Sequence, residues 1–128
     1  MLVRTILACS AILLLVRPGA AEDCQLLGFE AREQVLRHAP TCDKANELFG
    51  DCAYGPSGDI SLCQIVTEKC EVNFLNKLSK AQRRTYDRAM KRCDAKYENI
   101  DATMYCAMAA GGRADLAQSY AHKFGKAR

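Results

Sequence analysis

The sequence predicts an all-α fold, a small disulfide-stapled bundle of five or six short helices. Apolar side chains recur at steps of three and four residues along most of the chain, which is the spacing of one helix face. Alternating apolar and polar runs and Asn-Gly turns, which would indicate strands and hairpins, are absent from the sequence. The chain of 128 residues also contains eight cysteines, enough to cross-link a small domain.

The first 21 residues are expected to be a signal peptide. Arg4 gives a positive start, residues 5–16 form a largely apolar run, and Gly19-Ala20-Ala21 supplies the small residues of a cleavage site after Ala21. This run is shorter than the roughly 20 residues that a membrane-spanning helix needs, so an uncleaved anchor is the weaker alternative. No transmembrane span is expected in the mature chain. We therefore expect a periplasmic or secreted bacterial protein with a single domain at residues 22–128.

The first part of the mature chain is expected to form two helices and a loop. The first helix covers residues 24–39 and ends before Pro40, because proline disfavours helical continuation. Its expected buried face consists of Leu27, Ala31, Val35 and His38. Thr41 can cap a second helix at residues 42–49, with Gly50 as its stop signal. Residues 51–58 are rich in glycine and proline and indicate a loop.

The central helix is the element that the sequence predicts most strongly. Before it, a helix starting at Asp59 or Ser61 runs to near Leu78, with a buried stripe made of Cys63, Val66, Cys70 and Phe74. Ser79 then fits an N-cap for residues 79–97, and Gln82 stands at the capping-box position. The expected buried face of this helix consists of Tyr86, Ala89, Met90, Cys93 and Tyr97.

The end of the chain is expected to form two short helices. Residues 99–101 separate the central helix from a helix at residues 102–110. Gly111-Gly112 is expected to break that helix, because glycine is a poor helix former. Helical character then resumes over residues 113–123, where Leu116 and Tyr120 share a face.

The cysteines that follow the leader are expected to form a disulfide framework, as in other small exported domains. They are Cys24, Cys42, Cys52, Cys63, Cys70, Cys93 and Cys106. Because their number is odd, at least one is free, bound to a small thiol or bound to a second chain, which permits a disulfide-linked dimer. No metal site or cofactor is expected, because Cys-x-x-Cys is absent and His38 and His122 are distant in sequence.

Geometry restricts the pairing without deciding it. Cys63 and Cys70 would lie about 10 Å apart on one helix, too far to bond each other. If the helices on either side of Leu78 form an antiparallel hairpin, Cys63 comes level with Cys93. If the chain also turns back near Asn99, Cys106 comes level with Cys93 as well, and both alternatives remain open.

Charge divides the mature chain into an acidic and a basic half. Residues 22–71 carry ten acidic and four basic side chains, whereas residues 72–128 carry twelve basic and five acidic ones. Two candidate binding surfaces follow from this asymmetry. The candidate basic face consists of Lys77, Lys80, Arg84, Arg88 and Lys91. The candidate acidic loop consists of Glu47, Asp51 and Asp59.

A set of residues from the central helix onward resembles the LprI-type lysozyme-inhibitor N-terminal domain family. The residues that carry this resemblance are Gln82, Arg83, Tyr86, Cys93, Tyr97, Thr103, Met104 and Tyr105, with a closing Arg113-Ala114-Asp115-Leu116 and Tyr120. The chain departs from the family pattern in having Tyr86 in place of a tryptophan, Ala102 in place of a glycine and Cys106 in place of a later cysteine. The resemblance implies a small exported helical domain whose partner is a lysozyme or another envelope protein.

The sequence therefore predicts a non-enzymatic binding protein. A lysozyme inhibitor would use the acidic loop, because many lysozymes are strongly basic. The alternative is an envelope-associated protein that binds anionic lipid or lipopolysaccharide through the basic face. No catalytic residues are assigned, because the available bases for a cysteine nucleophile are His38 and His122, at opposite ends of the mature chain, and Pro40 interrupts the helix between His38 and Cys42. No carboxylate pair for acid–base catalysis is identifiable either. Nucleic acid is not an expected partner.

Overall fold

The computed structural model describes residues 24–96 and 102–125, with the side chains of residues 102–107 left out. The described chain forms a 3-10 helix at Cys24–Leu26 and the helices α1 (Phe29–His38), α2 (Cys42–Cys52), α3 (Pro56–Glu71), α4 (Lys80–Ala95) and α5 (Ala102–Phe124), with a second 3-10 helix at Leu75–Lys77. No strand occurs in these ranges. The predicted all-α, disulfide-stapled fold is confirmed.

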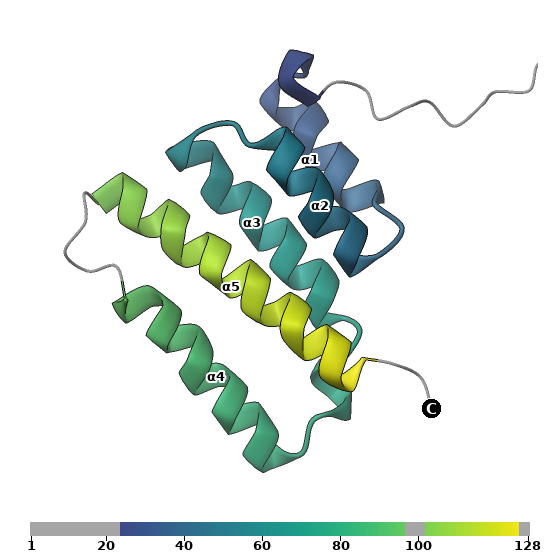
Figure 1. Ribbon diagram of the computed structural model, residues 1–128, viewed down its shortest axis with the longest axis vertical. Helices are drawn as coiled ribbons and strands as arrows, with labels where there is room; N and C mark the ends of the chain where they lie inside the picture. The colour runs from purple at the N-terminus through teal and green to yellow at the C-terminus, as the bar shows by residue number, and fades with distance from the viewer. Residues whose placement is uncertain (1–23, 97–101, 126–128) are drawn as a thin grey trace, which may run out of the picture.

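The helices form a bundle in which α3 and α5 occupy the middle (Figure 1). Helices α1 and α2 pack on one side of α3, and α5 packs along its other side. Helix α4 lies against α5 at the opposite edge of the bundle from α1 (Figure 1). Because α5 lies between them, α3 and α4 do not pack as the direct hairpin considered from the sequence.

The core lies mainly between α3 and α5. Helix α3 contributes the predicted stripe of Cys63, Val66 and Cys70, and Phe74 follows in the turn after it; all four are buried. Helix α5 presents a stripe of buried alanines, which are Ala110, Ala114, Ala117 and Ala121. Side chains this small allow two helix backbones to approach closely, so a modest core still packs densely.

Two disulfides link α2 to its neighbours. Cys24–Cys52 joins the N-terminal 3-10 helix to the end of α2, and Cys42–Cys70 joins the start of α2 to the end of α3. Cys63 and Cys93 are free, so the pairing considered between them does not form. The side chain of Cys106 lies outside the described residues. With both its ends cross-linked, α2 is fixed against the rest of the bundle.

Several predicted helix boundaries were wrong. Helix α2 continues through Gly50 to Cys52, and α5 runs through Gly111-Gly112 without a break. A glycine costs a helix about 1 kcal/mol relative to alanine. Packing of α5 between α3 and α4 offsets this cost, and the Cys24–Cys52 disulfide holds the last turn of α2.

The two ends of the predicted loop at residues 51–58 were also wrong. Helix α3 starts at Pro56, earlier than Asp59 or Ser61, and Gly55 is its N-cap. Gly55 has a φ of 134°, a conformation that glycine adopts without strain. Proline at the first helical position has no amide donor to leave unsatisfied, so it starts this helix well.

The first helix differs most from its prediction, because an arginine, Arg32, is buried on its inner face. Residues 24–26 form a 3-10 turn, α1 begins at Phe29, and its buried residues are Arg32 and Leu36. Ala31 and His38 of the predicted face are exposed, and Leu27 and Val35 are half-buried. The period was right, but the face was displaced by about one residue.

Arg32 is 6% exposed, and no carboxylate of the described residues pairs with it. Its guanidinium donates to four backbone carbonyls, those of Gln25, Leu27, Cys52 and Ala53, at 2.6–3.1 Å. Two of these carbonyls lie at the C-terminal end of α2, where the helix dipole favours a cation. The ring of Tyr54 lies 5.0 Å from the guanidinium carbon. Arg32 therefore ties α1 to the end of α2.

Candidate functional site

Helix α4 is the most exposed helix of the bundle, and its start is fixed locally. Ser79 accepts a hydrogen bond from the Gln82 amide at 3.2 Å, and the Gln82 side chain accepts one from the Ser79 amide at 2.8 Å. This is the predicted capping box. Tyr86 is its one buried residue, while Ala89, Met90 and Cys93 are half-buried. The predicted buried face is confirmed for these four; Tyr97 lies outside the described residues.

The opposite side of α4 is a row of exposed cations, here called the cationic face. It consists of Lys80, Arg84, Arg88, Lys91 and Arg92. The side chains of Lys80, Arg84, Lys91 and Arg92 form no ion pair or hydrogen bond with the described part of the chain. Arg88 donates to the Thr85 hydroxyl at 3.4 Å. Arg92 was missed from the sequence, although its spacing of four from Arg88 would have found it.

Lys77, the first residue of the predicted basic face, has a different role. It lies in the 3-10 helix before α4, and its Nζ donates to the Gly125 carbonyl at 2.9 Å. This bond ties the turn before α4 to the end of α5. Lys77 is therefore not part of the cationic face.

The acidic residues of α4 lie on one flank of the cationic face. Asp87 pairs with Arg83 at 3.0 Å, and Asp94 pairs with Arg113 of α5. On a helical wheel Asp87 and Asp94 share one side, and Ala81 and Thr85 lie on the other. The cationic charge is thus balanced on one flank only, and the second flank borders α5 with no carboxylate from α4.

A groove lies along that second flank, between the start of α4 and the end of α5. Ala81, Gln82 and Thr85 line it from α4, and Tyr120, Lys123 and Phe124 line it from α5. Its volume is ≈ 300 Å³. The sequence did not predict this groove, because its two walls are about 40 residues apart and come together only through packing of α4 on α5.

The predicted acidic loop is not one cluster of free carboxylates. Glu47 pairs with Lys44 at 2.7 Å. Asp59 accepts hydrogen bonds from the backbone amides of Tyr54 and Gly55 at 2.7 and 3.2 Å, which closes the turn before α3. Asp51 is exposed on α2, one turn after Glu47. Glu47 and Asp51 therefore share a helix face, whereas Asp59 has a structural role.

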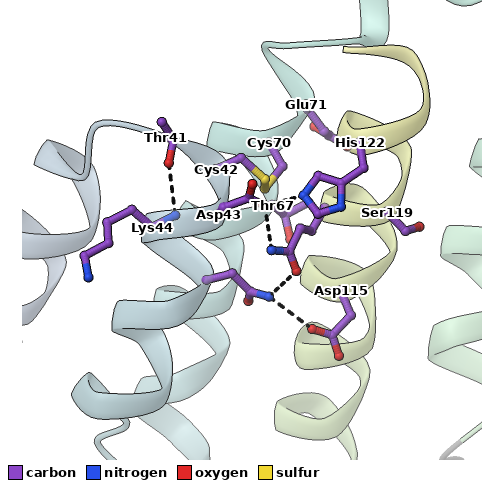
Figure 2. Close-up of a disulfide and its surroundings, with 12 residues drawn as sticks. Thr41, Cys42, Asp43, Lys44, Thr67, Cys70, Glu71, Asp115, Ser119 and His122 are labelled. Atoms are coloured by element: carbon purple, nitrogen blue, oxygen red, sulfur yellow. Dashed lines mark hydrogen bonds and ion pairs between the residues drawn. A yellow bond between two sulfur atoms is a disulfide. The ribbon is translucent and has the colours of Figure 1, made fainter. Parts of the chain in front are cut away.

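A polar network beside the Cys42–Cys70 disulfide joins α2 to α5 (Figure 2). Asp43 of α2 accepts hydrogen bonds from Gln118, at 2.8 Å, and from His122. Asn46 donates to Gln118 at 2.6 Å and reaches Asp115 at 3.4 Å. The hydrogen bond from Gln118, followed by that from His122, lowers the pKa of Asp43. His122, weighed from the sequence as a catalytic base, holds two helices together here.

Neither of the free thiols in the described part of the chain, Cys63 and Cys93, is activated. Cys63 is 1% exposed, and burial, reinforced by the charges of Asp59 and Asp115, raises its pKa to about 12. Burial raises the pKa of Cys93 as well, with Asp94 adding to the effect. A thiol that stays protonated is a poor nucleophile and a poor metal ligand. Among the described residues, no group of three or more His, Cys, Asp or Glu side chains is placed to hold a metal ion.

The residues that carry the LprI-type resemblance have structural surroundings where they are described. Gln82 belongs to the capping box and Arg83 to the pair with Asp87. Tyr86 is 1% exposed and donates to Glu71 at 2.8 Å. Tyr97 and the side chains of Thr103, Met104 and Tyr105 lie outside the described residues.

We compared the chain with known proteins in three ways. A scan against protein-family models and searches of curated proteins and of solved structures each found no match to this chain. Within the described ranges, every helix is too short or too polar to cross a lipid bilayer.

Proposed function

We propose that this protein is an exported binding protein, without catalytic activity, that docks on an anionic surface of the cell envelope through the cationic face of α4. The predicted leader and the two disulfides support export, because disulfides persist in oxidising compartments. The partner is a membrane containing anionic lipid or lipopolysaccharide, whose phosphates attract exposed lysines and arginines.

The observation that carries this proposal is the row of four cations on α4 without a partner in the described chain. Four like charges on one face repel one another, so a bound polyanion would relieve that repulsion. Helix α4 also lies at the edge of the bundle, with α3 and α5 between it and the acidic α1–α2 region. The row of cations can therefore approach a negatively charged surface while the acidic residues of α1 and α2 stay on the other side of the bundle.

Co-sedimentation with vesicles containing phosphatidylglycerol tests this proposal, using the exported protein with both disulfides intact. Near such a surface each cation contributes about 1 kcal/mol, so Arg84→Gln with Arg88→Gln should weaken binding roughly thirtyfold. The matched control is Arg37→Gln with Lys44→Gln, which removes the same charge from α1 and α2 and should bind like the parent. Binding should also fall steeply as salt is added. Absence of binding at low salt would contradict the proposal.

Lysozyme inhibition is the second candidate, and it rests on the acidic edge rather than on α4. Glu47 and Asp51 lie one turn apart on the exposed side of α2 and would attract a basic enzyme. The LprI-type resemblance favours the same partner. A muramidase assay decides: inhibition that is lost in Glu47→Gln with Asp51→Asn supports this candidate. Unchanged activity at micromolar excess of the protein removes it.

A further inference from the structure

We propose that the groove between α4 and α5 accommodates one acyl chain of an anionic lipid, whose headgroup is held by the cations beside it. This inference rests on the proposed function and makes it more specific. The cationic face alone would bind any dense array of negative charge, whereas the groove would select an amphiphile with an aliphatic chain.

The floor of the groove is a continuation of the aromatic core. Tyr120 packs against the buried Tyr86 at 4.8 Å between ring centroids, and Phe124 packs against Tyr120 at 5.5 Å. Tyr120 and Phe124 are only half-buried, so each presents part of its ring to the groove. Ala81 and Thr85 line the facing wall. An aliphatic chain in this position would cover apolar surface that is otherwise exposed to water.

The rim of the groove is positively charged. Lys123 lines it, with its Nζ 5.2 Å from the centroid of the Phe124 ring. Arg88 lies at the opposite wall, where it donates to the hydroxyl of the groove residue Thr85. None of the described residues that line the groove is acidic. An apolar floor between two cations complements an amphiphile with an aliphatic chain and a negatively charged carboxylate or phosphate head.

The size and shape of the groove favour part of one chain over a bulkier occupant. Its ≈ 300 Å³ lies at the small end of ligand sites, which range over about 300–1,000 Å³. A free phosphate would gain nothing from the aromatic floor, and a neutral alkane would gain nothing from Lys123 and Arg88. Because the groove borders the cationic face, a lipid could remain in its bilayer while the end of α5 contacts its chain.

The test is titration of the full exported protein with fatty-acid anions of increasing length, from hexanoate to dodecanoate, each kept monomeric and followed by calorimetry. Each methylene that enters the groove should strengthen binding about fourfold. Ala81→Phe should fill the groove and weaken dodecanoate binding about tenfold. Ala95→Phe is the matched control, because it places the same ring at the far, exposed end of α4, and it should bind like the parent.

Affinity that is independent of chain length in the parent protein would overturn the proposal without relying on any variant. Equal dodecanoate binding by Ala81→Phe and Ala95→Phe would also overturn it. Vesicle binding without dodecanoate binding would leave the cationic face in place and reject the groove. Absence of vesicle binding would reject the proposed function itself. Displacement of dodecanoate by an acidic peptide but not by phosphatidylglycerol would assign the groove to a protein partner and so reject the lipid.

Discussion

Removing the Cys42–Cys70 disulfide should destabilise the protein strongly. This bridge closes a loop with a sequence separation of 28. For a loop of this length, the entropy that the bridge removes from the unfolded chain is worth about 3.5 kcal/mol at room temperature. Cys42→Ala with Cys70→Ala should therefore lower the free energy of unfolding by about that amount and lower Tm by roughly 15–25 °C.

The measurement is reversible urea unfolding followed by circular dichroism, with Cys63→Ala as the control. Cys63 is buried like Cys42 and Cys70, but it is not cross-linked, so this variant reports the loss of one buried sulfur alone. We expect that loss to be about 1 kcal/mol. If the double variant loses no more than twice the control, the disulfide adds nothing beyond packing, and the view that this small core depends on cross-links is refuted.

Three further predictions concern single side chains. Arg32→Met should lower the free energy of unfolding by about 3 kcal/mol, because four carbonyls lose their donor; a loss below about 1 kcal/mol in urea unfolding would contradict its role. The pKa of Asp43 is lowered in the folded state, so its stabilising contribution is present above the ordinary value of 3.8 and is lost as the pH falls through the lower, folded value. Asp43→Asn should therefore reduce the fall in the free energy of unfolding at acid pH. An unchanged fall would show that the hydrogen bonds of Asp43 to Gln118 and His122 contribute nothing. Burial raises the pKa of Tyr86, so its contribution to stability should fall as the pH rises above 10.0, where the tyrosine of the unfolded chain ionises first; Tyr86→Phe should therefore weaken the alkaline dependence in urea titrations, and the raised pKa values of Cys63 and Cys93 account for the part that remains.

Local signals in the sequence were sufficient for α4. Its start depends on two residues three apart, Ser79 and Gln82, and its buried side follows from the helical period around Tyr86. The row of cations could be predicted for the same reason, because residues three and four apart on one helix share a face whatever the helix packs against. Arg92 follows the same rule.

Features that depend on contacts between distant segments could not be predicted. Gly111 and Gly112 read as a break because a helix in isolation is weakened by glycine, and only the packing of α5 between α3 and α4 overcomes that cost. An arginine is normally expected at the surface, and Arg32 is buried because carbonyl groups at the end of α2, a distant segment, accept its hydrogen bonds. The disulfide pairing and the groove share this origin, since each joins residues from separate helices.

Backbone amide shifts in NMR spectra, recorded while the protein binds nanodiscs containing phosphatidylglycerol, would show directly which surface contacts the membrane. We predict that the largest changes fall on residues 80–92 and on the end of α5 around Lys123. The amides of α1 and α2 should remain unchanged. Changes centred on Glu47 and Asp51, or no changes at low salt, would contradict the claim that the cationic face of α4 is the binding surface.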